Sequence, residues 1–160
     1  MRMLIAAVGK LKDDEERSIV ARYAKRFDAT GKSLALGPLE IIEMPEGRAA
    51  SADSRKVDES TRLMKIASSA DFIIALDVQG RSLTSEAFAK LLAKVRDGGA
   101  KSCALLIGGP DGHGADVLAH ANLKLSLGAL TLPHGLARVV LSEQLYRAAT
   151  IIAGHPYHRS

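Results

Sequence analysis

Short apolar runs alternate with helical patterns along this chain of 160 residues, and this alternation limits the fold more than any other feature. Strands that alternate with helices predict an α/β fold, a mostly parallel sheet flanked by helices. The predicted strands are 3–9, 39–44, 72–77, 102–109 and 123–130, and the predicted helices are 13–27, 51–69, 84–99, 114–122 and 136–153. Because no linker, internal repeat or low-complexity segment interrupts this series, we expect residues 1–160 to form a single domain.

The composition excludes several classes of protein. Hydrophobic residues make up 47% and charged residues 25% of the chain, which is typical of a globular domain and not of a disordered segment. No apolar run approaches the ~18 residues that a transmembrane helix needs, and the apolar opening is too short for a signal peptide. We therefore expect a soluble, cytoplasmic protein without a membrane partner. The net charge of +4 permits an acidic partner such as nucleic acid but does not require one.

Two other features have plain structural interpretations. Cys103 lies inside the apolar run "SCALLIGG", where a buried structural thiol is the favoured interpretation. A loose group of cations is expected to line the solvated face of a helix. Its members are Arg48, Arg55, Lys56, Arg62 and Lys65.

Ligands of parallel α/β sheets bind beyond the carboxyl ends of the strands, and three segments of this chain follow strands in that way. They are "LDVQG" at 76–80, "IGGPDGHG" at 107–114 and "LGALTLPHG" at 127–135. The glycines of the second segment do not complete a dinucleotide-binding motif, because position 117 is a valine. Its "GGPDG" is equally consistent with a tight turn and with a backbone that approaches a flat ligand closely.

Histidines near the end of the chain raise the question of a metal site. His155 and His158 are separated by Pro156, which prevents them from sharing a helical face. The spacing offers no third ligand, so we predict that the protein binds no metal.

Three stretches carry a resemblance to a known family: "LLIGGPDG", "LSLGALTLPHGLARVVLSEQLYRA" and the terminal "HPYHRS". They resemble the bacterial methyltransferases that modify N3 of a pseudouridine in large-subunit ribosomal RNA. These enzymes belong to the SPOUT class of S-adenosylmethionine-dependent RNA methyltransferases, and the resemblance covers nearly the whole chain. It implies a deep trefoil knot near the C-terminus that holds the methyl donor. Periodicity by itself does not reveal such a knot.

The resemblance also implies where the donor, S-adenosylmethionine, binds. It assigns the pocket to Leu76, to Gly108 and to the segment 127–132, which consists of Leu127, Gly128, Ala129, Leu130, Thr131 and Leu132. Small and aliphatic side chains with exposed backbone groups suit an adenine ring. For Thr131, a role as the cap of the following helix is an alternative. His113 stands where relatives carry an aliphatic residue, and its role is left open.

The last residues are interpreted as the part that handles the acceptor base. Methyl transfer requires donor and acceptor to be held in line, and N3 of a pseudouridine must lose a proton. Tyr157 is expected to stack on or hydrogen-bond a base, and Arg159 to bind a phosphate or a carbonyl. His155 or His158 is a candidate base or orienting group, although bulk solvent is an alternative proton acceptor. Arg138 is expected to contact RNA or the subunit interface. For the last residues of the chain, the competing interpretation is an ordinary solvated tail.

The resemblance finally implies partners. It suggests a homodimer whose active site lies near the subunit interface, with the last residues of one copy serving its neighbour. A symmetric dimer would double the surface that such a short chain offers to RNA. The expected substrate is ribosomal RNA within the assembled ribosome. There are two alternatives to this function. The protein methylates another RNA such as transfer RNA, or it binds RNA without catalysing a reaction.

Overall fold

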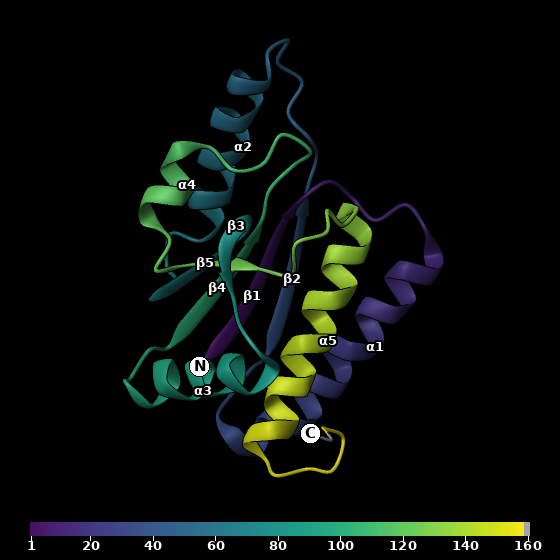
Figure 1. The fold of residues 1–160 in the computed structure, drawn as a ribbon, viewed down its shortest axis with the longest axis vertical. Helices are drawn as coiled ribbons and strands as arrows, with labels where there is room; N and C mark the ends of the chain where they lie inside the picture. Colours follow the sequence, from purple (N-terminus) through teal and green to yellow (C-terminus); the bar gives the residue numbers. More distant parts are fainter. Residues whose placement is uncertain (159–160) are drawn as a thin grey trace.

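The computed structural model describes residues 1–158 and contains one five-stranded parallel sheet (Figure 1). The strands run in the order β2-β1-β4-β3-β5, and all four pairings between neighbours are parallel. Their bounds are β1 Arg2–Val8, β2 Leu39–Met44, β3 Phe72–Ser82, β4 Ser102–Ile107 and β5 Leu123–Ser126. The predicted α/β class with a parallel sheet is confirmed.

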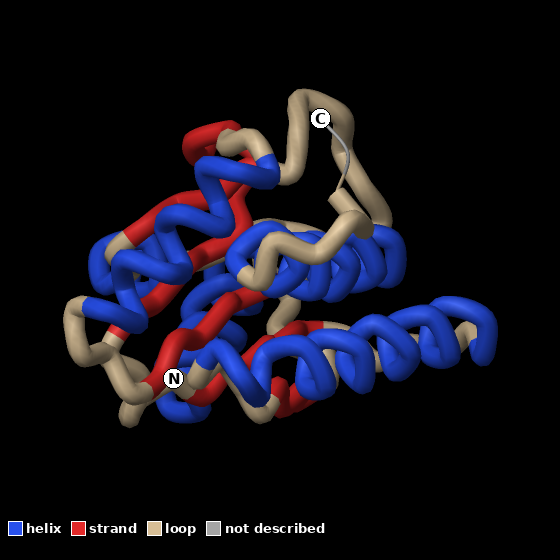
Figure 2. Tube along the Cα trace, turned by 90° about the horizontal axis from the view of Figure 1, so that it is seen from below, coloured by secondary structure: helices blue, strands red, loops and turns tan. Residues whose placement is uncertain are grey.

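Helices cover both faces of this sheet (Figure 2). The helix bounds are α1 Asp14–Gly31, α2 Ala52–Ile66, α3 Ser85–Asp97, α4 Ala115–His120 and α5 His134–Ile152, with a short 3₁₀ helix at Lys32–Leu34. The helices α1, α3 and α5 pack on one face, and α2 and α4 pack on the other. Among residues 1–158, no helix is both long and apolar enough to cross a membrane.

The core is aliphatic and lies on both faces of the central strands. In β1, Ile5 and Ala7 face the layer of α1, α3 and α5, whereas Ala6 and Val8 face the layer of α2 and α4. This two-sided burial explains why the central strands read as continuous apolar runs instead of alternating ones. Cys103 is buried in the first of these layers, and burial raises the pKa of its thiol to about 12. Its interpretation as a structural thiol is confirmed.

Several elements differ in length from their prediction, and α1, β3 and β5 are three of them. The helix α1 continues to Gly31 through part of the expected loop, and Leu36 then closes the turn by donating its N–H to the Gly31 carbonyl. The strand β3 extends to Ser82, with an irregularity that places both Leu76 and Arg81 opposite Leu125. The strand β5 ends at Ser126, earlier than predicted, because the chain turns there into the segment that joins it to α5.

Candidate active site

Strand register brings the three predicted donor segments together. Leu76 of β3 pairs with Ile107, the residue before Gly108, and also with Leu125, two residues before Leu127. Because β4, β3 and β5 are neighbours and run parallel, their carboxyl ends meet at one edge of the sheet. The structure therefore places Leu76, Gly108 and the start of 127–132 side by side, and their binding of a ligand stays a prediction.

The glycine turn that follows β4 is closed by its own backbone. Gly109 and Gly112 form an isolated antiparallel bridge, and the Gly112 N–H donates to the Gly109 carbonyl at 2.9 Å. Gly112 has a φ of +85°, a conformation that suits glycine, and no atom lies within 4 Å of the place where its Cβ would be. One side of the turn is therefore bare backbone that is open to a ligand.

The helix α2 supports the other side of this turn. Its Arg55 forms an ion pair with Asp111 at 2.7 Å, and its Ser60 hydroxyl accepts a hydrogen bond from the Gly114 N–H at 2.7 Å. Arg55 therefore departs from the expected solvated face. Glu59 is only 2% exposed, accepts from the Gly47 N–H at 2.7 Å and leaves its Oε2 without a partner. That oxygen lies 2.5 Å from where a Cβ of Gly109 would be, so Gly109 leaves room for the carboxylate.

His113 is the next residue of the turn and lies against its inner side. Its Nε2 lies 3.2 Å from the Leu106 carbonyl oxygen, which can only accept, so this nitrogen carries the proton. The neutral ring then presents Nδ1 as an acceptor, and that atom is buried without a partner near Gly108. Burial lowers the pKa of His113 below its ordinary value of 6.5.

This burial predicts a pH dependence of stability. In the unfolded chain His113 takes up a proton below about pH 6.5, whereas the native imidazole resists it, so stability falls as the pH drops below that value. The slope from one group is at most about 1.4 kcal/mol per pH unit. Chemical denaturation of the wild type and of His113→Leu between pH 7 and pH 5 should show a steeper loss in the wild type. Parallel curves would contradict the assignment.

Gly108 faces inward, which changes the reason why its replacement should be harmful. A Cβ at Gly108 would lie 3.1 Å from the Gly112 carbonyl carbon and 3.2 Å from the His113 Nδ1, within the turn and not in open space. Gly108→Val should therefore distort the turn, at about 1–3 kcal/mol. If the turn binds the donor, calorimetry with S-adenosylmethionine should show a loss of about 5- to 150-fold in affinity.

Gly98→Val is the control for this substitution. A Cβ at Gly98 would also be crowded, at 3.2 Å from the Lys94 carbonyl oxygen, but Gly98 lies at the end of α3. Wild-type donor affinity in Gly108→Val would refute the assignment of the turn to the donor pocket.

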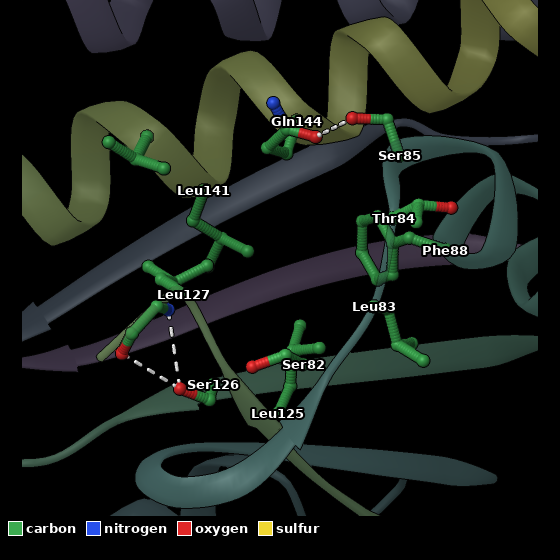
Figure 3. A pocket seen from close by; sticks show the side chains of 12 residues that line it. Ser82, Leu83, Thr84, Ser85, Phe88, Leu125, Ser126, Leu127, Leu141 and Gln144 are labelled. Atoms are coloured by element: carbon green, nitrogen blue, oxygen red, sulfur yellow. Dashed lines mark hydrogen bonds between the residues drawn. The ribbon is translucent and has the colours of Figure 1, made fainter.

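A pocket of about 350 Å³ opens between the end of β3, the end of β5 and α5 (Figure 3). Leu127 and Gly128 line it, but Leu76, Gly108 and 129–132 do not. Its polar side chains include those of Thr84, Ser85 and Gln144, and the Ser85 hydroxyl donates to the Gln144 Oε1 at 2.7 Å. The pocket therefore combines an apolar wall with hydrogen-bonding groups next to the first part of the predicted donor segment.

Residues 129–131 of the donor segment are exposed to solvent, whereas Leu132 is half-buried. Leu130 is 82% exposed, and Thr131 is exposed as well. Pro133 is the residue that precedes α5, and no side chain caps this helix, so the alternative role of Thr131 as a cap is wrong.

Tyr157 of the tail packs against α5 of its own chain. Its hydroxyl donates to the Glu143 Oε1 at 3.0 Å, its ring centre lies 4.6 Å from that of Tyr146, and the Arg147 guanidinium lies 4.9 Å away. Arg147 also forms an ion pair with Glu143 at 2.6 Å. Burial, together with hydrogen bonding to Tyr23 and Glu143, raises the pKa of Tyr157. This hydroxyl is therefore protonated at neutral pH and acts as a donor.

The two tail histidines have different surroundings. The His158 Nε2 lies 2.6 Å from the Glu86 Oε1 at the start of α3. The Thr84 hydroxyl, the backbone of Glu86 and His158 together lower the pKa of Glu86 to about 2, so its carboxylate is charged at neutral pH. His155 is exposed, and its Nδ1 accepts from the Tyr157 N–H at 3.2 Å. Arg159 lies outside the described residues.

A chain of side-chain hydrogen bonds connects the tail to the pocket. Tyr157 contacts Glu143, whose Oε2 accepts from the Gln144 Nε2 at 2.7 Å, and Gln144 in turn accepts from Ser85. Sequence reasoning missed Glu143 and also missed Glu86 and Arg147. The spacing of Glu143 and Arg147, four residues apart on the polar face of the last helix, was the available signal.

Arg138 lies inside the protein and not on a surface that faces RNA. Its side chain is 1% exposed, forms an ion pair with Glu43 and donates to the Gly9 carbonyl at 3.0 Å. Glu43 also accepts from the Leu11 N–H at 3.1 Å. In this structure Arg138 therefore joins the start of α5 to the segment after β1. Its buried position does not support direct contact with RNA.

Comparison with known proteins assigns the chain to a class. Residues 1–158 match the family described as "Predicted SPOUT methyltransferase", and the chain belongs to that family. Among curated proteins, it is 46% identical over 160 residues to a protein of Brucella anthropi and to one of Xanthobacter autotrophicus, each covered over its whole length. Both relatives are named ribosomal RNA large subunit methyltransferase H.

Solved structures show the same fold at low identity. TrmJ from Z. mobilis ZM4 superposes with a TM-score of 0.54 over 92% of this chain and 70% of that one, at 14% identity. A probable methylase family protein from Haemophilus influenzae Rd KW20 has a TM-score of 0.56 at 13% identity, over 99% of this chain and 70% of that one. The expected SPOUT fold class is confirmed, while the threading of the trefoil knot stays a prediction. Within residues 1–158 no group of three or more metal-ligating side chains occurs.

Proposed function

We propose that this protein transfers a methyl group from S-adenosylmethionine to N3 of a pseudouridine in large-subunit ribosomal RNA. The observation that carries the proposal is similarity over the entire chain to proteins named for methylation of that RNA. The structure adds a sheet edge at which the three predicted donor segments meet. We further propose that residues 1–160 act as one methyltransferase domain in the cytoplasm.

Small residues and bare backbone support a donor site formed by Leu76, Gly108 and 127–132. Gly112 and Gly128 both have positive φ, and no atom lies within 4 Å of the place where a Cβ would be, so the side of the backbone that a side chain would cover is open at both residues. Leu127 and Leu130 add apolar surface that suits an adenine ring. When bound, S-adenosylmethionine supplies an electrophilic methyl group. The protein's task is to orient that group and exclude water from it.

The tail is proposed to orient the acceptor base. Tyr157, held by Glu143, offers a hydroxyl and a ring face, and His158, held by Glu86, offers an imidazole. Arg159 would add a cation for a phosphate or a carbonyl oxygen of the base. The proton on N3 is accepted by His155, by His158 or by solvent. Arg138 is assigned a positioning role, because its buried ion pair holds the start of α5 immediately after the donor segment.

Exposed leucines support the proposed homodimer. Leu130, within the donor segment, is 82% exposed, and Leu136, in the first turn of α5, is 46% exposed. A second copy that covers them would place the active site near the subunit interface and enlarge the surface offered to an assembled ribosome. Size measurement in solution by light scattering tests the dimer, and Leu130→Ser with Leu136→Ser should weaken it.

Mass spectrometry of ribosomal RNA from cells with and without this protein tests the proposed activity. We expect one methylated pseudouridine to disappear from the large-subunit RNA when the protein is absent. Methyl incorporation into purified ribosomes, separate subunits and transfer RNA then identifies the substrate form. Incorporation into transfer RNA alone would favour the alternative substrate. Failure to bind S-adenosylmethionine at millimolar concentration would favour a non-catalytic role in RNA binding.

A further inference from the structure

Charged side chains are rare in the three donor segments that meet at the carboxyl edge of the sheet. The segments are 76–80, 107–114 and 127–135. Together they contain two carboxylates, Asp77 and Asp111, and no lysine or arginine. Asp111 is paired with Arg55 at 2.7 Å, whereas Asp77 forms no ion pair within residues 1–158. Asp77 is therefore the carboxylate of these segments whose charge is left for a ligand.

Local contacts hold Asp77 at the point where the donor segments meet. It directly follows Leu76, whose strand pairings bring the three segments together. Its Oδ1 accepts a hydrogen bond from the Gln79 N–H at 2.9 Å. The next residue, Gly80, lies so close to β5 that a Cβ there would be 2.6 Å from the Lys124 carbonyl carbon. The half-buried carboxylate thus has a fixed position beside the predicted donor pocket.

His113 lies within electrostatic reach of Asp77 without adding a cation to the site. Its Nε2 lies 3.2 Å from the Leu106 carbonyl oxygen, and its Nδ1 is buried beside Gly108. Burial lowers the pKa of His113 and outweighs the nearby backbone carbonyls and the Asp77 carboxylate, which favour the charged ring. Because this pKa lies below 6.5, the ring is neutral at pH 7 and leaves the Asp77 charge in place.

No cation of the surrounding elements is paired with Asp77 in the described part of the chain. The strands β3 and β5 contribute Arg81 and Lys124, which are exposed and form no ion pair there. A cationic ligand at this edge would therefore meet Asp77 without a competing partner. The other charged groups around the glycine turn are paired or lie beside a glycine: Arg55 with Asp111, Lys56 with Asp53, His120 with Asp116, and Glu59 beside Gly109.

We propose that Asp77 is the counterion of the methyl donor, and that neutral His113 keeps this carboxylate available to it. The inference rests on the proposed function and names the residue that recognises the charge of the donor. S-adenosylmethionine carries a sulfonium, a cation that has no N–H or O–H to donate. A carboxylate therefore stabilises it through charge alone, and partial burial strengthens that attraction relative to water.

The same carboxylate distinguishes the donor from its by-product. When the methyl group is transferred, the bond between sulfur and the methyl carbon breaks and its electron pair stays on the sulfur. S-adenosylhomocysteine is therefore neutral at sulfur, while its adenosine, amino and carboxylate groups are those of the donor. Asp77 favours the charged ligand over the neutral one, which helps the spent donor to leave. A carboxylate that only bound the ribose would treat the two ligands alike.

The test compares the wild type with Asp77→Asn by calorimetry, using S-adenosylmethionine and S-adenosylhomocysteine at about pH 7. Asparagine keeps the oxygen that accepts from the Gln79 N–H, so the backbone should keep its shape. The affinity for S-adenosylmethionine should fall about tenfold, because a nearby opposite charge is lost, and that for S-adenosylhomocysteine by about twofold or less.

Asp116→Asn is the matched control. It removes an exposed carboxylate in the first turn of α4, close to the glycine turn in sequence but beside His120. We expect this variant to change the two affinities little and equally. Equal losses for both ligands in Asp77→Asn, or no loss for either, would overturn the inference.

A pH series tests the part assigned to His113. As the pH falls below 6.5 the ring begins to take up a proton, and the imidazolium then competes with the sulfonium for Asp77. Because the donor-bound protein holds fewer protons, the affinity should fall with the pH, by at most about tenfold per pH unit for one proton. Between pH 7 and pH 5 the loss should be larger in the wild type than in His113→Leu, with circular dichroism showing that both stay folded. The same loss in both proteins would show that His113 does not act on the donor.

Methylation assays on ribosomal subunits distinguish failure of the inference from failure of the proposed function. If Asp77 selects S-adenosylmethionine but no ribosomal RNA is methylated, the proposed function fails while the inference stands. If the RNA is methylated and Asp77→Asn weakens both ligands equally, the proposed function stands and the inference fails.

Discussion

Deletion of residues 155–160 should reduce methyl transfer to ribosomes by about 100-fold or more while leaving the fold intact. The expected loss follows from the removal of Tyr157 and His158, because groups that exchange protons with a reacting base typically contribute about 10²–10⁴-fold. The fold should persist because α5 ends at Ile152 and the core contains no tail residue. Single-turnover rates, circular dichroism and calorimetry with S-adenosylmethionine measure turnover, fold and donor affinity. Full activity in the truncated protein would make the tail an ordinary solvated segment.

Mixed dimers decide which subunit the tail serves. In this structure Tyr157 and His158 contact α5 and α3 of their own chain, whereas the family resemblance implies that the tail serves a neighbouring copy. We expect activity to reappear when the tail-deleted protein is mixed with Gly108→Val, since one intact donor turn then meets one intact tail. No recovery after demonstrated subunit exchange would confine the tail to its own chain.

Arg138→Met should destabilise the protein by about 3 kcal/mol, because it leaves Glu43 beside an apolar side chain without its cation. For a chain of this size, that loss corresponds to a fall in Tm on the order of 10 °C. Thermal unfolding followed by circular dichroism measures it. Donor affinity should also fall, since the start of α5 follows the donor segment directly.

The double variant Arg138→Met with Glu43→Leu separates a lost ion pair from a stranded charge. Removing both partners should restore part of the stability, because no uncompensated carboxylate remains. If the double variant is less stable than Arg138→Met, Glu43 stabilises the fold through other contacts, such as the hydrogen bond from the Leu11 N–H, and the expectation is wrong. Recovery of stability without recovery of donor affinity would indicate that Arg138 positions the donor segment specifically.

Periodicity in the sequence predicted most of the secondary structure, since apolar runs and helical faces respond to burial on each side of the sheet. It placed β2 at 39–44 and assigned Cys103 to the core, and both agree with the structure. It erred where the tertiary context decides the outcome. The helix α1 runs through an expected loop, and Arg138 is buried because Glu43, far away in sequence, supplies the carboxylate.

The candidate site was predictable only in part for the same reason. Parallel strands imply that Leu76, Gly108 and Leu127 meet at one edge, and the register confirms that proximity. Local patterns could not show that Glu59 fills the space beside Gly109 or that Glu143 and Glu86 hold the tail, because each contact joins segments that are distant in the chain. The knot and the dimer depend on the family resemblance and not on any local signal.

The contacts between α2 and the glycine turn offer a way to detect ligand binding at the turn from the outer surface of the protein. Arg55 and Ser60 of α2 contact Asp111 and Gly114 of the turn, and Glu59 contacts Gly47, so we expect a movement of the turn to displace α2. Val57, 64% exposed on that helix, lies on the outer surface. If the turn binds the donor as proposed, a fluorophore attached through a cysteine at position 57 should report donor binding from outside the site.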